Sequence, residues 1–180
     1  MKHFLIIYLL ILTLASCSSE NKDILNQPTY DGPSMEMDSI KTMYSDSAIV
    51  KIMIRAPKQL NFSNGNEEYP NGISLEFFNE LGEVISTLEA NKAYYIEKEK
   101  HYKGVGNVIV VNLETGDRLN TEELFWNPKE EKVYTNKFVT IRSEDEVHTG
   151  EGLIANQDFD NYQIMKPTGT IIIEESNEIN

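Results

Sequence analysis

The sequence has a single cysteine, Cys17, and only three histidines among its 180 residues. One thiol cannot form an internal disulfide, and it cannot supply a Cys₄ or Cys₂His₂ zinc site. Beyond the N-terminal segment only His101 and His148 remain, one in a charged loop and the other in a strand-like run. We therefore predict no metal site and no other cofactor.

Motifs of catalysis and of nucleic-acid binding are also missing. The sequence has no G-x-S-x-G turn, no P-loop and no G-x-G-x-x-G after a strand. Carboxylates are plentiful, but none is singled out as half of a glycosidase pair, so a hydrolase is the least favoured class. Sixteen basic against twenty-nine acidic residues give a net charge of −13, which disfavours binding to phosphate backbones. We predict no catalytic residues and no nucleic-acid partner.

Long apolar runs are absent except over residues 4–14, which follow a short basic start. This run is shorter than the about twenty residues that span a bilayer, and its length is typical of a secretory leader. It ends in Leu14-Ala15-Ser16-Cys17, which resembles the bacterial lipoprotein signal, where the cysteine is lipidated and the chain is cut before it. We predict a signal peptide over residues 1–16 and a lipid anchor at Cys17. A plain signal peptide with an incidental cysteine is the alternative.

The mature chain divides into a polar tether and a β-rich domain. Residues 17–44 contain prolines and polar side chains without a clear strand period, which predicts a tether to the membrane. Residues 45–180 alternate short β-rich runs with turn sequences, and Pro57 is predicted to end the first run. About a dozen strands at such spacing predict an all-β sandwich, jelly roll or barrel. The runs span residues 49–55, 73–78, 84–88, 93–96, 105–113, 119–126, 132–135, 138–142, 146–149, 153–155, 162–165 and 171–174.

An internal repeat refines this prediction. Residues 49–56, 83–90 and 117–124 align at successive offsets of 34, and a fourth copy near Val147 follows at an offset of 28. Each unit reads as a strand pair that cannot bury its apolar face alone, so stacked units would form an elongated β body. Chance similarity between β-rich segments is the alternative.

The ordered series of segments from Tyr69 onward resembles the LptC family, and the resemblance extends over residues 45–173. It implies an elongated, open antiparallel β jelly roll and a role as the periplasmic component of the lipopolysaccharide export ABC transporter. Many members carry a membrane-spanning helix, whereas this sequence has the lipoprotein signal. The segments that carry the resemblance are YPNGISLEFFNELGEV (69–84), LEANKAYY (88–95), GNVIVVN (106–112), LNTEELFWN (119–127), VYTNKFVTI (133–141), TGEGLIAN (149–156) and NYQI (161–164).

The implied partners are lipopolysaccharide, the inner-membrane export transporter and an LptA-like periplasmic bridge protein. The implied location is the periplasm of a Gram-negative bacterium, with the lipid anchor in the inner membrane. A glycan- or protein-binding surface lipoprotein with an unrelated β-sandwich fold is the alternative.

An apolar groove would suit this function, because sheltering one twelve-carbon acyl chain from water is worth on the order of 9 kcal/mol. Period-two alternation places each of three residue pairs on one face of its strand. We predict that these residues contact acyl chains, with ordinary core packing as the alternative for each. The pairs are Ile109 with Val111, Leu124 with Trp126, and Val139 with Ile141.

The C-terminal run is predicted to be an open strand edge that docks the bridge protein. Ile171, Ile172 and Ile173 are strongly β-forming, and the acidic residues after them discourage indiscriminate pairing. A closing strand of a sealed sandwich is the alternative.

Overall fold

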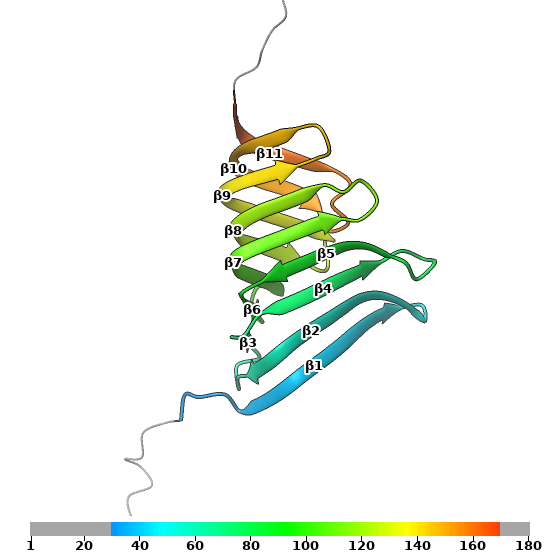
Figure 1. Cartoon of the computed structure of the whole chain (residues 1–180). Coiled ribbons are helices and arrows are strands. Elements are labelled where there is room, and N and C mark those ends of the chain that lie inside the picture. Colours follow the sequence, from blue (N-terminus) through cyan, green and yellow to red (C-terminus); the bar gives the residue numbers. More distant parts are fainter. Residues whose placement is uncertain (1–29, 170–180) are drawn as a thin grey trace, which may run out of the picture. The chain divides into compact units, whose positions relative to one another are not determined.

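The computed structural model describes residues 30–169. Contacts divide the chain into residues 1–31 and 32–180, and the second unit is described here by itself. Its eleven strands form one antiparallel sheet, which confirms the prediction of an all-β jelly roll (Figure 1). The described residues contain no helix that could cross a membrane. The strands are β1 (Met35–Asp46), β2 (Ile49–Asn61), β3 (Glu67–Tyr69), β4 (Ile73–Phe78), β5 (Val84–Ala90), β6 (Lys92–Ile96), β7 (His101–Asn112), β8 (Arg118–Asn127), β9 (Lys132–Arg142), β10 (Val147–Asn156) and β11 (Tyr162–Thr168).

The sheet wraps around its own interior because β2 and β7 each pair with several strands. The first half of β7 pairs with β6 and its second half with β5, while β8 runs along most of its length. A bulge between Val105 and Val108 separates the halves, and Gly106 there has a φ of 78° that favours glycine. The pairings of β2, β4, β5, β7, β6 and β3 therefore form a closed ring.

The repeat corresponds to strands that run in the same direction. Its four copies fall on β2, β5, β8 and β10, and a single antiparallel strand lies between each successive pair. These intervening strands are β4, β7 and β9. This arrangement is the stack of strand pairs that the repeat predicts. At the two ends of the stack, β1 and β11 each pair with one strand only among the described residues.

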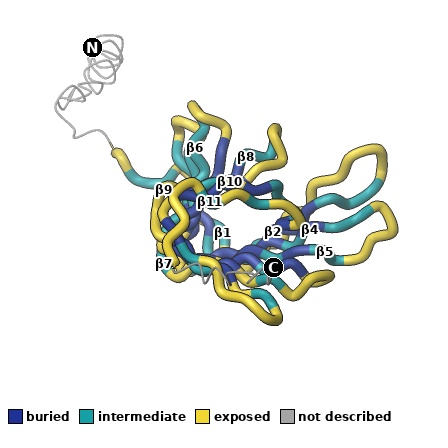
Figure 2. The backbone as a smooth tube through the Cα atoms, turned by 90° about the horizontal axis from the view of Figure 1, so that it is seen from above, coloured by how far each residue is buried: buried dark blue, intermediate teal, exposed yellow. Residues whose placement is uncertain are grey.

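The core is the interior enclosed by this sheet. Along most strands every second side chain is buried, as in β4, where Ile73, Leu75 and Phe77 are 6%, 2% and 1% exposed. Figure 2 shows the buried segments facing inward and the exposed turns pointing away. One apolar cluster runs from Ile52 in β2 to Ala155 in β10.

Among the boundaries that differ from the prediction, two lie in the first two strands. Residues 35–44, expected as tether, lie in β1, which is mostly exposed and is held by backbone pairing with β2. Pro57 does not end its strand, because it lies where its missing N–H is not needed. The β4 pairing stops at Arg55, and the β1 register skips Pro57 opposite Ser39, whose φ is 54°. The predicted strand over residues 171–174 lies outside the described residues.

Candidate functional site

Four of the six predicted groove residues lie in the interior. Leu124, Trp126, Val139 and Ile141 are at most 2% exposed and belong to the core cluster. Ile109 and Val111 share a face as expected, but it is the outer face, because Val108 and Val110 occupy the interior positions.

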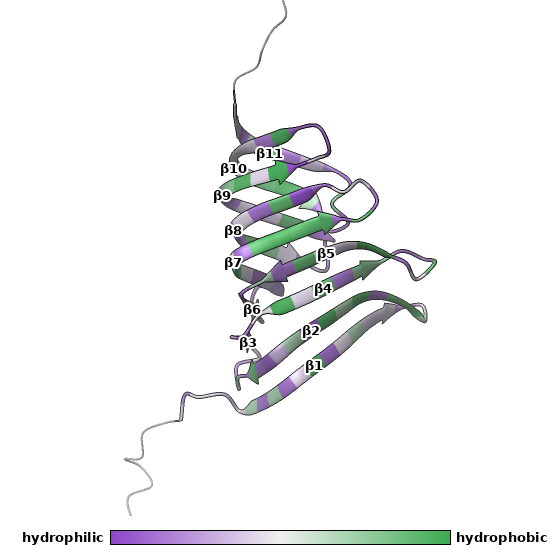
Figure 3. Ribbon diagram, in the orientation of Figure 1, coloured by the Kyte–Doolittle hydropathy of each residue, from purple (hydrophilic) through white to green (hydrophobic). Residues whose placement is uncertain are grey.

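Period-two alternation does not tell which face of β7 is buried. Residues 108–111 are all branched aliphatics, and Figure 3 shows this stretch of β7 as continuously hydrophobic. Alternation itself holds across the bulge, because Tyr102 and Gly104 before it and Val108 and Val110 after it are all buried. Acyl-chain contact by any of the six residues stays a prediction.

Five aromatic side chains meet in the interior, and we call them the aromatic cluster. Trp126 stacks on Tyr102 at 5.0 Å between ring centroids and meets Phe77 edge-on at 5.5 Å. Tyr95 and Tyr69 pack on Tyr102 at 4.9 and 6.5 Å. Such contacts add about 0.5–1.5 kcal/mol per pair beyond the area that they bury. The cluster brings together side chains of β3, β4, β6, β7 and β8.

The polar atoms of the aromatic cluster are uncharged and paired. The hydroxyl groups of Tyr44 and Tyr102 are 3.1 Å apart, and the Tyr69 hydroxyl donates to Glu67 Oε2 at 2.6 Å. Trp126 Nε1 donates to Gln157 Oε1 at 3.1 Å. Burial raises the pKa of Tyr69 and of Tyr102 well above the ordinary value, so both stay neutral at physiological pH. The cluster is thus an apolar surface with a few fixed hydroxyl groups.

A pocket of about 650 Å³ opens beside the aromatic cluster, and we call it the aromatic pocket. Its lining includes Tyr44 of β1, Ile52 of β2, Tyr102 and Trp126, together with Lys100. Deeper in the interior, the space among Leu75, Leu88 and their neighbours is only about 10 Å³, at the lower limit of the space that holds one water molecule. The aromatic pocket is therefore open space beside the interior, while side chains fill the core beyond it.

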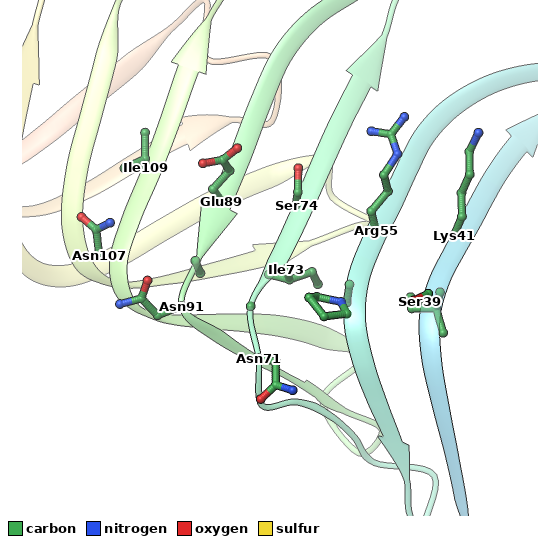
Figure 4. A pocket seen from close by; sticks show the side chains of 15 residues that line it. Ser39, Lys41, Arg55, Asn71, Ile73, Ser74, Glu89, Asn91, Asn107 and Ile109 are labelled. Carbon is green, nitrogen blue, oxygen red and sulfur yellow. The ribbon is translucent and has the colours of Figure 1, made fainter.

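A second hollow, which we call the outer groove, lies on the outer surface and has a volume of about 560 Å³. It crosses β1, β2, β4, β5 and β7, and Figure 4 shows its polar side chains along the strands. No sequence pattern predicts it, because its residues come from five strands whose register is set by folding. One row of its lining is in direct cross-strand register: Lys41, Arg55, Ser74, Glu89 and Ile109.

The two histidines of the described part have no common site. The prediction of a charged loop at His101 is wrong, because this residue is buried at the start of β7. Its ring contacts Phe125 and Tyr134, and its Nε2 lies 3.1 Å from Glu99 Oε2. His148 is exposed and lies near Glu146. Over residues 30–169, no three His, Cys, Asp or Glu side chains are grouped so that they could hold a metal ion.

The fold and the interior together define a β jelly roll with an aromatic-lined opening to its core. A family model described as lipopolysaccharide-assembly, LptC-related, matches residues 4–171. The chain therefore belongs to the LptC family, as the order of its segments predicts. No curated protein is similar enough to the chain to match it. Membership assigns the chain to lipopolysaccharide transport, and the family is one of transport components, not a known family of enzymes.

Proposed function

We propose that the protein passes lipopolysaccharide from the inner-membrane ABC transporter to a periplasmic bridge and shelters the acyl chains in its interior. The observation that carries this proposal is the continuous apolar core from β2 to β10, with the aromatic pocket at its opening. Moving one twelve-carbon chain from water into such surroundings is favourable by on the order of 9 kcal/mol. That gain favours entry of an acyl chain among the apolar side chains of the core.

Partner docking is proposed at the two ends of the strand stack. The outward edges of β1 and β11 carry no strand partner among the described residues, so their backbone groups can bond to a strand of another protein. Ile171, Ile172 and Ile173 follow β11 in the sequence but lie outside the described residues. The bridge protein would dock at this C-terminal end and the transporter at the β1 end.

Photocrosslinking tests the acyl path. A photoreactive residue at Leu124 or Val139, both buried in the interior, is expected to capture lipopolysaccharide during export. The matched control is Lys137, an exposed residue of β9, the strand that carries Val139. The measurement is the amount of lipopolysaccharide linked to each variant after irradiation of cells. Equal labelling of Lys137 and Val139, or none at both interior sites, would contradict the proposed acyl path.

The lipid anchor at Cys17 is proposed from the sequence alone, because this residue lies outside the described part of the chain. Cys17→Ser is expected to abolish incorporation of radiolabelled fatty acid and to leave the precursor uncut. Gel mobility and the label measure both effects, with wild type as the control. A wild-type protein that is processed normally but takes up no label would rule out lipidation.

A further inference from the structure

The outer groove has the length of a short oligosaccharide. Its register row runs from Lys41 on β1 to Ile109 on β7, across five neighbouring strands. Adjacent strands lie about 4.8 Å apart, so the row is about 19 Å long. The volume of about 560 Å³ is spread along this row. An elongated polar chain fills such a groove better than a compact ligand does.

Three amide side chains on one wall of the outer groove have unused hydrogen-bonding capacity. Asn71 precedes the β4 strand, Asn91 follows β5, and Asn107 lies in the β7 bulge (Figure 4). The Asn91 backbone N–H donates to Gly106 O at 2.9 Å, which holds Asn91 beside the bulge. None of the three amides bonds to another side chain or backbone group within residues 30–169. Each offers donors and an acceptor together, as neighbouring sugar hydroxyls require.

The β1–β2 end of the outer groove is basic. Lys41 and Arg55 are directly opposite in register, which places two basic side chains next to each other on the outer face. Arg55 forms an ion pair with Glu76, while Lys41 has no ion-pair partner in the described part of the chain. Lys41 and Arg55 are the lysine and the arginine of the groove lining, so they form its basic end.

The floor of the outer groove borders the interior. Ile73, which is 6% exposed, lines both the groove and the small space in the core beside Leu75. In the described structure, the backbone pairing of β2 with β4 ends at Arg55 and Ser74, directly beside the groove. Beyond Arg55 and Ser74, side chains such as Ile73 separate the outer groove from the core, because no backbone hydrogen bonds join β2 and β4 there.

We propose that the outer groove binds the saccharide part of the glycolipid, as an oligosaccharide that bears an acidic group such as a phosphate. The acidic group lies at Lys41 and Arg55, and the sugar hydroxyls bond to Glu89, Asn91 and Asn107. This inference rests on the proposed function, because the acyl chains of the same molecule occupy the interior. The saccharide and the acyl chains of one glycolipid molecule are then held on opposite sides of the sheet.

Calorimetric titration of the full chain in detergent micelles tests the groove. The probe is the acyl-free oligosaccharide obtained by deacylating lipopolysaccharide, used with its phosphates and after their enzymatic removal. Lys41→Ala is expected to weaken binding of the phosphorylated probe about tenfold, the value of one charge-assisted hydrogen bond at an exposed side chain. Removing the phosphates should weaken wild-type binding equally and cancel the effect of Lys41→Ala. Asn91→Ala should weaken both probes severalfold.

Lys137→Ala is the matched control, because it removes the same charge at an exposed position outside the groove lining. An equal loss of affinity in both lysine variants, or no binding of either probe, overturns the inference. Displacement of the oligosaccharide by an equal concentration of inorganic phosphate would show a simple anion site and also overturn it. Lipid capture at Leu124 is scored separately: capture without oligosaccharide binding overturns the groove alone, and loss of both overturns the proposed function too.

Discussion

Gly150→Ala is expected to lower the free energy of unfolding by about 2–3 kcal/mol and to detach β11 from the sheet. A Cβ atom on Gly150 would lie 2.4 Å from Ile164 Cγ2, 2.5 Å from the Lys166 carbonyl oxygen and 2.9 Å from Pro167 Cα. Two of these atoms belong to backbone, so the strand itself must move. Chemical denaturation measures the loss of stability, and amide hydrogen exchange of β11 measures the detachment.

Gly169→Ala is the control for this substitution, since no atom lies within 4 Å of its added Cβ. It should leave both measurements unchanged. Because β11 is the proposed docking edge, Gly150→Ala should also weaken binding to the bridge protein in pull-down assays. Protected β11 amides in Gly150→Ala would show that the strand tolerates the added methyl group.

Trp126→Ala is expected to cost about 3–5 kcal/mol of stability, a large part of the total for a domain of this size. The side chain is 2% exposed, and its loss would leave a cavity beside Phe77 and Tyr102. Trp126→Phe keeps a ring there and loses chiefly the bond to Gln157, so about 1 kcal/mol is expected. Trp126 is the only tryptophan, so its substitution removes the tryptophan fluorescence signal. Denaturation is therefore followed by circular dichroism.

Phe138→Ala provides the comparison, because this aromatic side chain is 56% exposed on β9. Its effect should stay within about 0.5 kcal/mol. A similar cost at Phe138 and Trp126 would mean that the aromatic cluster adds no more to stability than a surface ring does.

The sequence predicted strands well where polar and apolar residues alternate or turn residues bound a run. The run over residues 73–78 coincides with β4, while the runs over 132–135 and 138–142 are one strand, β9. The register between β8 and β9 shifts between the two runs, and such a bulge interrupts the alternation of buried and exposed side chains without ending the strand. β1 was assigned to the tether because its side chains are mostly exposed, and backbone pairing leaves no mark in composition.

The candidate sites were predictable only in part, for two physical reasons. Buried positions such as Leu124 and Val139 follow from alternation within one strand. The outer groove depends on register between strands, which aligns Lys41 with Arg55 although fourteen positions separate them in the sequence. The faces of β7 were indistinguishable because aliphatic side chains occupy both.

The closed ring of pairings makes the shortest strand, β3, its weakest joint. β3 is three residues long, with two register pairs to β2 and three to β6, whereas the other pairings of the ring have four to six. Parting β3 from β2 would break few backbone bonds, and Glu67 of β3 lines the aromatic pocket. On the proposed acyl path, separating β3 from β2 is therefore the way to widen the aromatic pocket that breaks the fewest backbone hydrogen bonds.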